Sequence, residues 1–85
     1  MHNYKHELRH FIVENFLFGR HDDPFSDDDS FLKLGIIDST GVLELVTFLQ
    51  QQYHITIEDE ELIPDNLDSI NRLVRFVTRK AEKVA

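Results

Sequence analysis

The sequence predicts an all-α fold, a bundle of three long helices and one or two short ones. Apolar side chains recur at intervals of three and four residues in three segments, near residues 4–18, 39–52 and 68–77, and this spacing is the period of an amphipathic helix. Residues 53–57 alternate as a strand does, but no second convincing strand is present to pair with them. We expect an extended connection there.

The composition predicts a single small domain, spanning residues 1–85. A chain of 85 residues holds one modest core, and 41% hydrophobic residues with seven phenylalanines supply it. Cysteine is absent, so neither a disulfide nor a thiolate metal site is available. The N-terminal segment lacks the apolar core of a signal peptide, and no run approaches the ~18 apolar residues of a membrane span. These features favour a cytoplasmic protein that does not bind a membrane.

The charge favours proteins as binding partners. Nine basic and sixteen acidic residues give a net charge of −7, which repels nucleic acid and anionic membranes and favours partners with basic surfaces. Basic residues gather late in the chain, and cations near the end of a helix are expected from the helix dipole. They are Arg72, Arg75, Arg79, Lys80 and Lys83.

The first helix is expected over residues 4–18, with Gly19 as its stop. His2, His6 and His10 are spaced four apart and would share one face of it. No carboxylate is fixed among them to orient the imidazoles, and they lie near a terminus. We therefore predict solvated histidines and no metal site.

The segment 20–30 is an aspartate-rich linker that fails as a calcium loop. Starting the twelve-residue pattern at Asp23 puts Asp28 at the glycine position and Leu34 at the glutamate position, and a start at Asp27 fails in the same way. The aspartates are expected to keep the linker in water.

Beyond the linker, Asp29 or Ser30 is expected to cap a short turn through residues 31–34. The second long helix should begin at Ser39 with Asp38 as its cap and reach about Gln52. Its apolar stripe is expected to be broad and buried, and consists of Val42, Leu45, Val46 and Leu49, widened by Leu43 and Phe48. Gly41 indicates that a small side chain is useful beside Ser39, for instance where something bulky approaches.

A single helical turn is expected at residues 58–63, with acids at its start and Pro64 closing it. The last helix should begin near Asp68 or Ser69. It is expected to bury Ile70, Leu73, Val74 and Val77.

Ser39 is the residue of chemical interest, and its context argues against catalysis. A nucleophile elbow needs glycine two residues before the serine, where Ile37 stands. His54 or His21 would have to fold close to act as a base, and a small bundle offers no deep cleft to exclude water. We predict no enzyme activity.

An attachment site suits Ser39 better. Free backbone N–H groups and the positive end of the helix dipole would favour a phosphate ester there. Asp38 is expected to cap the helix, with a role for a modifying enzyme as the less favoured alternative. Asp68 and Ser69 repeat the same dipeptide at a helix start, but Ser69 is explained as a capping residue after Pro64.

These residues carry a resemblance to a known family. Residues 34–39 (Leu-Gly-Ile-Ile-Asp-Ser), 44–46, 53–57 and 68–74 resemble the acyl carrier proteins, including the aminoacyl, D-alanyl and peptidyl carriers. The resemblance covers nearly the whole chain. It implies a four-helix bundle with a short third helix and a long loop between helices 1 and 2, and it implies a monomer.

The resemblance also implies a function. A phosphopantetheinyl transferase would recognise Asp38 and use coenzyme A to place 4′-phosphopantetheine on Ser39. The thiol of this arm would carry an acyl or aminoacyl group as a thioester, received from an adenylating ligase and passed to downstream acyl-transferring enzymes. The implied docking residues are Thr40, Val42, Leu43, Glu44, Glu58, Asp59, Glu60 and Glu61.

The chain departs from the fatty-acid carriers of this family. Those carriers tend to have leucine after the serine and a strongly acidic second helix, whereas this chain has Thr40 and only Glu44 as an acid between residues 40 and 52. The pattern is closer to stand-alone carriers that serve adenylating ligases. The apolar pattern does not separate a cavity for an acyl chain from ordinary core packing, and an unmodified helical adaptor remains the alternative.

Overall fold

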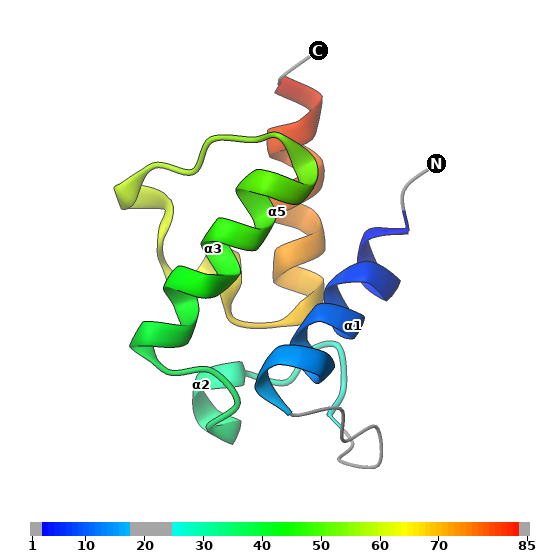
Figure 1. The fold of residues 1–85 in the computed structure, drawn as a ribbon, viewed down its shortest axis with the longest axis vertical. Helices are drawn as coiled ribbons and strands as arrows, with labels where there is room; N and C mark the ends of the chain where they lie inside the picture. The colour runs from blue at the N-terminus through cyan, green and yellow to red at the C-terminus, as the bar shows by residue number, and fades with distance from the viewer. Residues whose placement is uncertain (1–2, 18–24, 84–85) are drawn as a thin grey trace.

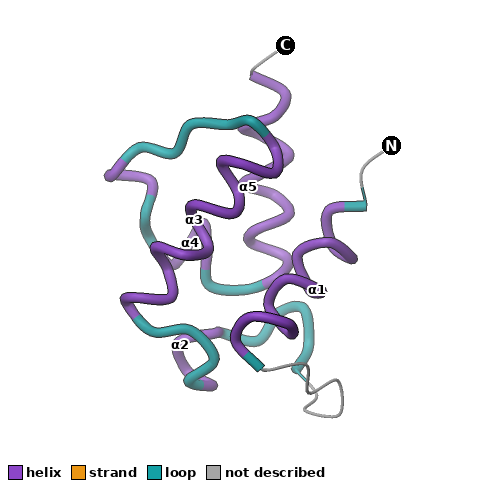
Figure 2. The backbone as a smooth tube through the Cα atoms, in the orientation of Figure 1, coloured by secondary structure: helices purple, strands orange, loops and turns teal. Residues whose placement is uncertain are grey.

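The computed structural model describes residues 3–17 and 25–83, and these residues form helices joined by loops (Figures 1 and 2). The all-α prediction is confirmed, and no strand occurs in either described range. The elements are α1 (Tyr4–Phe16), α2 (Phe31–Leu34), α3 (Ser39–Tyr53), the 3₁₀ helix η1 (Asp59–Glu61), α4 (Pro64–Leu67) and α5 (Ile70–Lys83). Three long helices therefore frame the bundle, as expected.

The helix starts follow local capping chemistry. Asn3 caps α1 by accepting a hydrogen bond from the backbone N–H of His6, and Ser30 caps α2 by accepting one from Lys33. Side-chain oxygens at these positions satisfy N–H groups that have no partner inside the helix. Of the two caps proposed for the short turn, Ser30 is the one used. Gly19, the expected stop of the first helix, lies outside the described residues.

Helix α5 holds the bundle together, because it packs against α1, α3 and α4. In Figure 1, α3 crosses in front of α5, and α1 runs beside them. The apolar stripes of the three long helices meet in one core. Its fully buried large side chains are Leu8, Ile12, Phe31, Leu45, Leu49, Ile70, Leu73, Phe76 and Val77.

Some apolar positions differ from the expected stripes. Leu43 is 61% exposed, so it does not widen the buried face of α3. On α5 Val74 is only half-buried, whereas Phe76 is buried although the four-residue stripe omitted it. The core extends further around α5 because α1 and α4 both contact this helix.

Pro64 opens a helix instead of closing one. The 3₁₀ helix η1 already ends at Glu61, and Pro64 is the first residue of α4. Proline is well suited to the first helical position, where its missing N–H is not needed. The single turn expected at 58–63 is therefore present as η1, and α4 follows it as a second short helix.

Within the described ranges no helix has the length and apolar character of a membrane span. The same ranges hold no group of three metal-ligating side chains, and His2 and His21 lie outside them.

Candidate functional site

Ser39 is the first residue of α3 and its side chain is exposed. Asp38 precedes it in an extended conformation, and its Oδ1 accepts a hydrogen bond from the Gly41 backbone N–H at 2.7 Å. The cap expected at Asp38 is therefore present. The Ser39 hydroxyl is exposed at the positive end of a helix of fifteen residues, where an anion is stabilised.

Gly41 is buried against the chain's own side chains. A β-carbon at this position would lie 2.8 Å from Phe16 Cε1 and 3.0 Å from Ile37 Cγ2. The small residue thus lets the start of α3 approach α1. No external molecule is needed to explain it.

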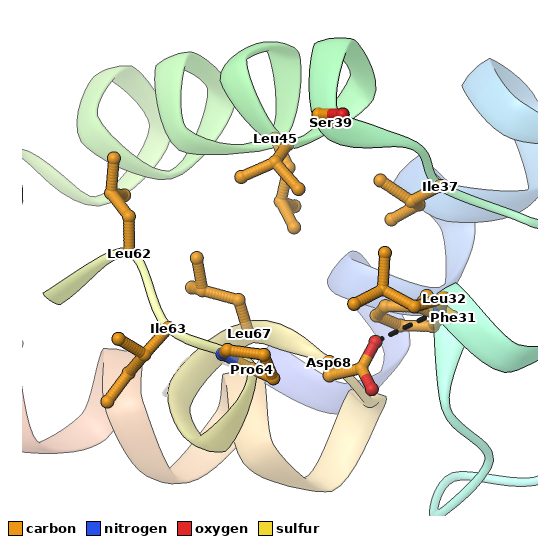
Figure 3. Close-up of a pocket in the computed structure, with 11 residues that line it drawn as sticks. Phe31, Leu32, Ile37, Ser39, Leu45, Leu62, Ile63, Pro64, Leu67 and Asp68 are labelled. Atoms are coloured by element: carbon orange, nitrogen blue, oxygen red, sulfur yellow. Dashed lines mark hydrogen bonds between the residues drawn. The ribbon is translucent and has the colours of Figure 1, made fainter.

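An apolar cavity of about 280 Å³ opens beside Ser39 (Figure 3). Figure 3 shows Ser39 on its rim, at the start of α3, with apolar side chains converging from α2, α3 and the segment 62–67. The cavity is lined by Phe31, Leu32, Ile37, Ser39, Val42, Leu45, Leu62, Ile63, Pro64, Leu67 and Asp68. A mostly apolar space beside an exposed hydroxyl can accept an apolar group tethered to that hydroxyl.

Asp68 closes one side of this cavity by holding α2 in place. Its carboxylate accepts hydrogen bonds from the Leu32 backbone N–H at 3.0 Å and from the Ser30 hydroxyl. Its carbonyl also accepts one from the Phe31 N–H at 3.0 Å. Asp68 is thus a structural residue that joins α2 to the α4–α5 junction.

Ser69 lies in a different environment from that of Ser39. It is 2% exposed, and its Oγ accepts a hydrogen bond from the Arg72 N–H at 3.1 Å. A modifying enzyme cannot reach a hydroxyl that is buried in this way. The repeated aspartate–serine pair is therefore explained by capping.

The histidine considered as a base for Ser39 is far away. His54 lies at the opposite end of α3, which spans fifteen residues and hence about 22 Å. A general base must lie within hydrogen-bond reach of its nucleophile. His21 lies outside the described residues.

The eight expected docking residues lie on two segments, α3 and the short segment around η1. Thr40, Leu43 and Glu44 are exposed on α3, while Val42 is half-buried and lines the cavity. Glu58, Asp59 and Glu60 are exposed at η1.

The Glu61 carboxylate is already hydrogen-bonded within the protein. Its Oε1 accepts hydrogen bonds from the Glu58 N–H and from Lys80 Nζ, both at 2.9 Å. The backbone hydrogen bond from Glu58, followed by that from Lys80, holds the pKa of the Glu61 carboxyl below its usual value. Glu61 ties η1 to α5 and contributes less free charge than its three neighbours.

The sequence reasoning missed the far wall of the cavity. Leu62, Ile63 and Pro64 were interpreted as the end of one helical turn, yet all three line the space opposite α3. The sequence did contain an indication of this wall. Leu62 and Ile63 form an apolar pair inside an acidic segment, and such a pair is unusual unless it packs against other apolar residues. Ile63 remains 44% exposed.

Comparisons with known proteins identify the family to which this chain belongs. Residues 17–77 match the family model of the phosphopantetheine attachment site. The probable acyl carrier protein PigG of Serratia sp. (strain ATCC 39006) is 33% identical over 73 residues, covering 86% of this chain and 83% of that protein. The crystal structure of an acyl carrier protein from Thermotoga maritima matches with a TM-score of 0.70 and 27% identity, over 99% of this chain and 98% of that one. The chain therefore belongs to the acyl carrier protein family, whose prosthetic group is phosphopantetheine.

Proposed function

We propose that this protein carries an acyl or aminoacyl group as a thioester on 4′-phosphopantetheine attached to Ser39. The observation that carries the proposal is the exposed hydroxyl of Ser39 at the start of α3, on the rim of an apolar cavity of about 280 Å³. The bound arm would supply the thiol, which the chain lacks because it contains no cysteine. The chain itself catalyses nothing in this proposal.

The attachment reaction uses Ser39 as the acceptor. The Ser39 Oγ forms a new bond to the phosphorus that bears the pantetheine of coenzyme A, and the pyrophosphate bond breaks. Adenosine 3′,5′-bisphosphate leaves, and the hydroxyl proton passes to a base of the transferase. Asp38 supports this step from the carrier side, because its hydrogen bond to Gly41 holds the first turn of α3 in a fixed position.

Two exposed groups are proposed to dock partner enzymes. Thr40, Leu43 and Glu44 on α3 would contact the transferase, the adenylating ligase and the downstream enzymes. Glu58, Asp59 and Glu60 would add negative charge that steers partners with basic surfaces. Val42 and Glu61 would act indirectly, through the cavity and through the position of η1.

Intact-mass spectrometry tests the attachment. The protein is incubated with coenzyme A and a broad-specificity phosphopantetheinyl transferase, and we expect a mass gain of one phosphopantetheinyl group. Ser39→Ala should abolish the gain. Ser26→Ala, which removes an equally exposed hydroxyl, should retain it. No gain in the wild type, or a gain that survives Ser39→Ala, favours the unmodified adaptor.

Docking is tested by transferase kinetics against salt. Replacing Glu58, Asp59 and Glu60 by their amides should lower kcat/KM and weaken its salt dependence, because exposed charges are screened over about 8–10 Å. Glu61 is left intact, because its loss would also disturb the contact with Lys80. An unchanged salt dependence would assign docking to the apolar contacts near Leu43.

A further inference from the structure

An arginine-rich cleft lies on the α4–α5 face of this acidic protein. Three of the five arginines in the sequence, Arg72, Arg75 and Arg79, line it together with Asp65, Asn66 and the buried ring of Phe76. The cleft encloses about 410 Å³. The arginines follow one stripe of α5 over seven residues, or about 10 Å along the helix axis.

The helix dipole does not account for two of these cations, Arg72 and Arg75. Cations are favoured in the last turn of a helix, but α5 begins at Ile70, so Arg72 lies in its first turn and Arg75 soon after it. The helix dipole therefore explains neither residue, contrary to the expectation from sequence. Cations near a helix start are disfavoured by the dipole unless another interaction compensates for it.

The three guanidinium groups also make few strong interactions within the protein. Arg72 donates to Asp65 Oδ1 at 3.0 Å, but the Asp65 side chain is 86% exposed. Arg79 reaches Asn66 Oδ1 at 3.5 Å, the limit of a hydrogen bond, and lies 5.5 Å from the Phe76 ring centre. Arg75 is exposed, and the described residues offer it neither an ion pair nor a hydrogen bond.

We propose that this cleft is a second docking surface, which binds an acidic segment of a partner protein. A guanidinium group binds carboxylates through paired N–H donors. Cations spread over about 10 Å match several carboxylates of one segment better than they match a single small anion. A short acidic segment contacts the cleft alone. Nucleic acids and anionic membranes are extended polyanions that also reach the rest of the surface, where the net charge of −7 repels them.

The surface is separate from the Ser39 site. Asp65 and Asn66 of α4 line the arginine cleft, whereas Pro64 and Leu67 of the same helix line the apolar cavity. A partner bound at the cleft would therefore hold the carrier through the opposite side of α4 and leave Ser39 accessible. The proposal does not depend on modification of Ser39, so the Ser39→Ala protein should bind equally well.

Amide chemical shifts in the full chain test the proposal, with an eight-residue polyglutamate peptide as the probe. We expect shifts concentrated at residues 65–66 and 72–79, lost as salt is raised. Arg75→Gln should weaken binding about threefold to fivefold, the scale of one exposed ion pair. Lys33→Gln removes the same charge from the exposed side of α2 and should change binding less than twofold.

Other outcomes would contradict the proposal that this cleft is a docking surface. Shifts spread over the whole molecule, or equal effects of Arg75→Gln and Lys33→Gln, would indicate non-specific attraction. Competition by inorganic phosphate at the peptide's own concentration would indicate a small-anion site. Tighter binding of a DNA oligonucleotide of equal charge, or peptide-independent dimerisation that Arg75→Gln abolishes, would assign the face to nucleic acid or to a second copy.

Discussion

Gly41 and Phe16 bring the start of α3 into close contact with the end of α1. A β-carbon at position 41 would lie 2.8 Å from Phe16 Cε1, and it would also lie 3.0 Å from Ile37 Cγ2. Ser39 lies two residues before Gly41. Its position therefore depends on the side chain of Phe16, which is 23 residues before Ser39 in the sequence.

Gly41→Ala should destabilise the protein. Alanine gains up to about 1 kcal/mol of helix propensity over glycine, but overpacking against two side chains costs roughly 1–3 kcal/mol. We expect a net loss of about 1 kcal/mol in urea unfolding. Thr40→Ala, at an exposed neighbouring position, should change stability by less than about 0.5 kcal/mol. A Gly41→Ala protein more stable than the wild type would contradict the close contact.

Asp27 should contribute to stability in a pH-dependent way. It accepts a hydrogen bond from Arg9 Nη2 at 2.6 Å and pairs with Lys5 Nζ at 3.2 Å. The hydrogen bond from Arg9 is the main cause that holds its pKa below the ordinary 3.8. Above pH 3.8 the contribution is complete. It is lost as the pH falls below 3.8 and through the lower folded pKa, because the unfolded chain binds the proton more readily.

Asp27→Asn tests this dependence. The variant should be less stable at pH 7 by at most about 1 kcal/mol, the scale of partly exposed ion pairs. The difference from the wild type should shrink as the pH falls below 3.8. Asp59→Asn, which neutralises an exposed aspartate on η1, is the matched control. A difference that stays constant down to pH 2 would show that the ion pairs are not its source.

The cavity beside Ser39 should bind an acyl chain attached to the arm. Val42 lines this cavity, whereas its neighbour Leu43 is exposed and does not. Val42→Phe would fill part of the space, and Leu43→Phe would not. Given attachment at Ser39, loading with a hexanoyl group should shift the amides of Leu62 and Leu67 in the wild type and in Leu43→Phe, and shift them less in Val42→Phe. Equal shifts in all three would place the chain outside the cavity.

Local features of this fold were predictable from sequence. The periods of α1, α3 and α5 and the caps at Ser30 and Asp38 depend on residues a few positions apart, which a sequence displays directly. The prediction for Pro64 was wrong: it was expected to close a helical turn but begins α4, and proline is compatible with both positions. In the structure η1 already ends at Glu61, so Pro64 begins a new helix.

Features that join distant segments were not predictable. The cavity arises where α3 faces residues 62–67, and the Glu61–Lys80 pair joins residues nineteen positions apart. Neither leaves a local pattern in the sequence. The arginine cleft was visible as a basic cluster but was attributed to the helix dipole, an explanation that does not hold for Arg72 and Arg75, which lie near the start of α5.

Two substitutions at Asp38 separate its capping role from its proposed recognition by the transferase. Asparagine caps helices about as well as aspartate, whereas alanine does not. Asp38→Asn should therefore keep stability close to the wild type, and Asp38→Ala should lose about 1 kcal/mol with the hydrogen bond to Gly41. If the transferase recognises the carboxylate charge, both variants should show a lower kcat/KM for modification of Ser39. If only Asp38→Ala is slow, the transferase requires an ordered first turn of α3, and the carboxylate acts through the cap alone.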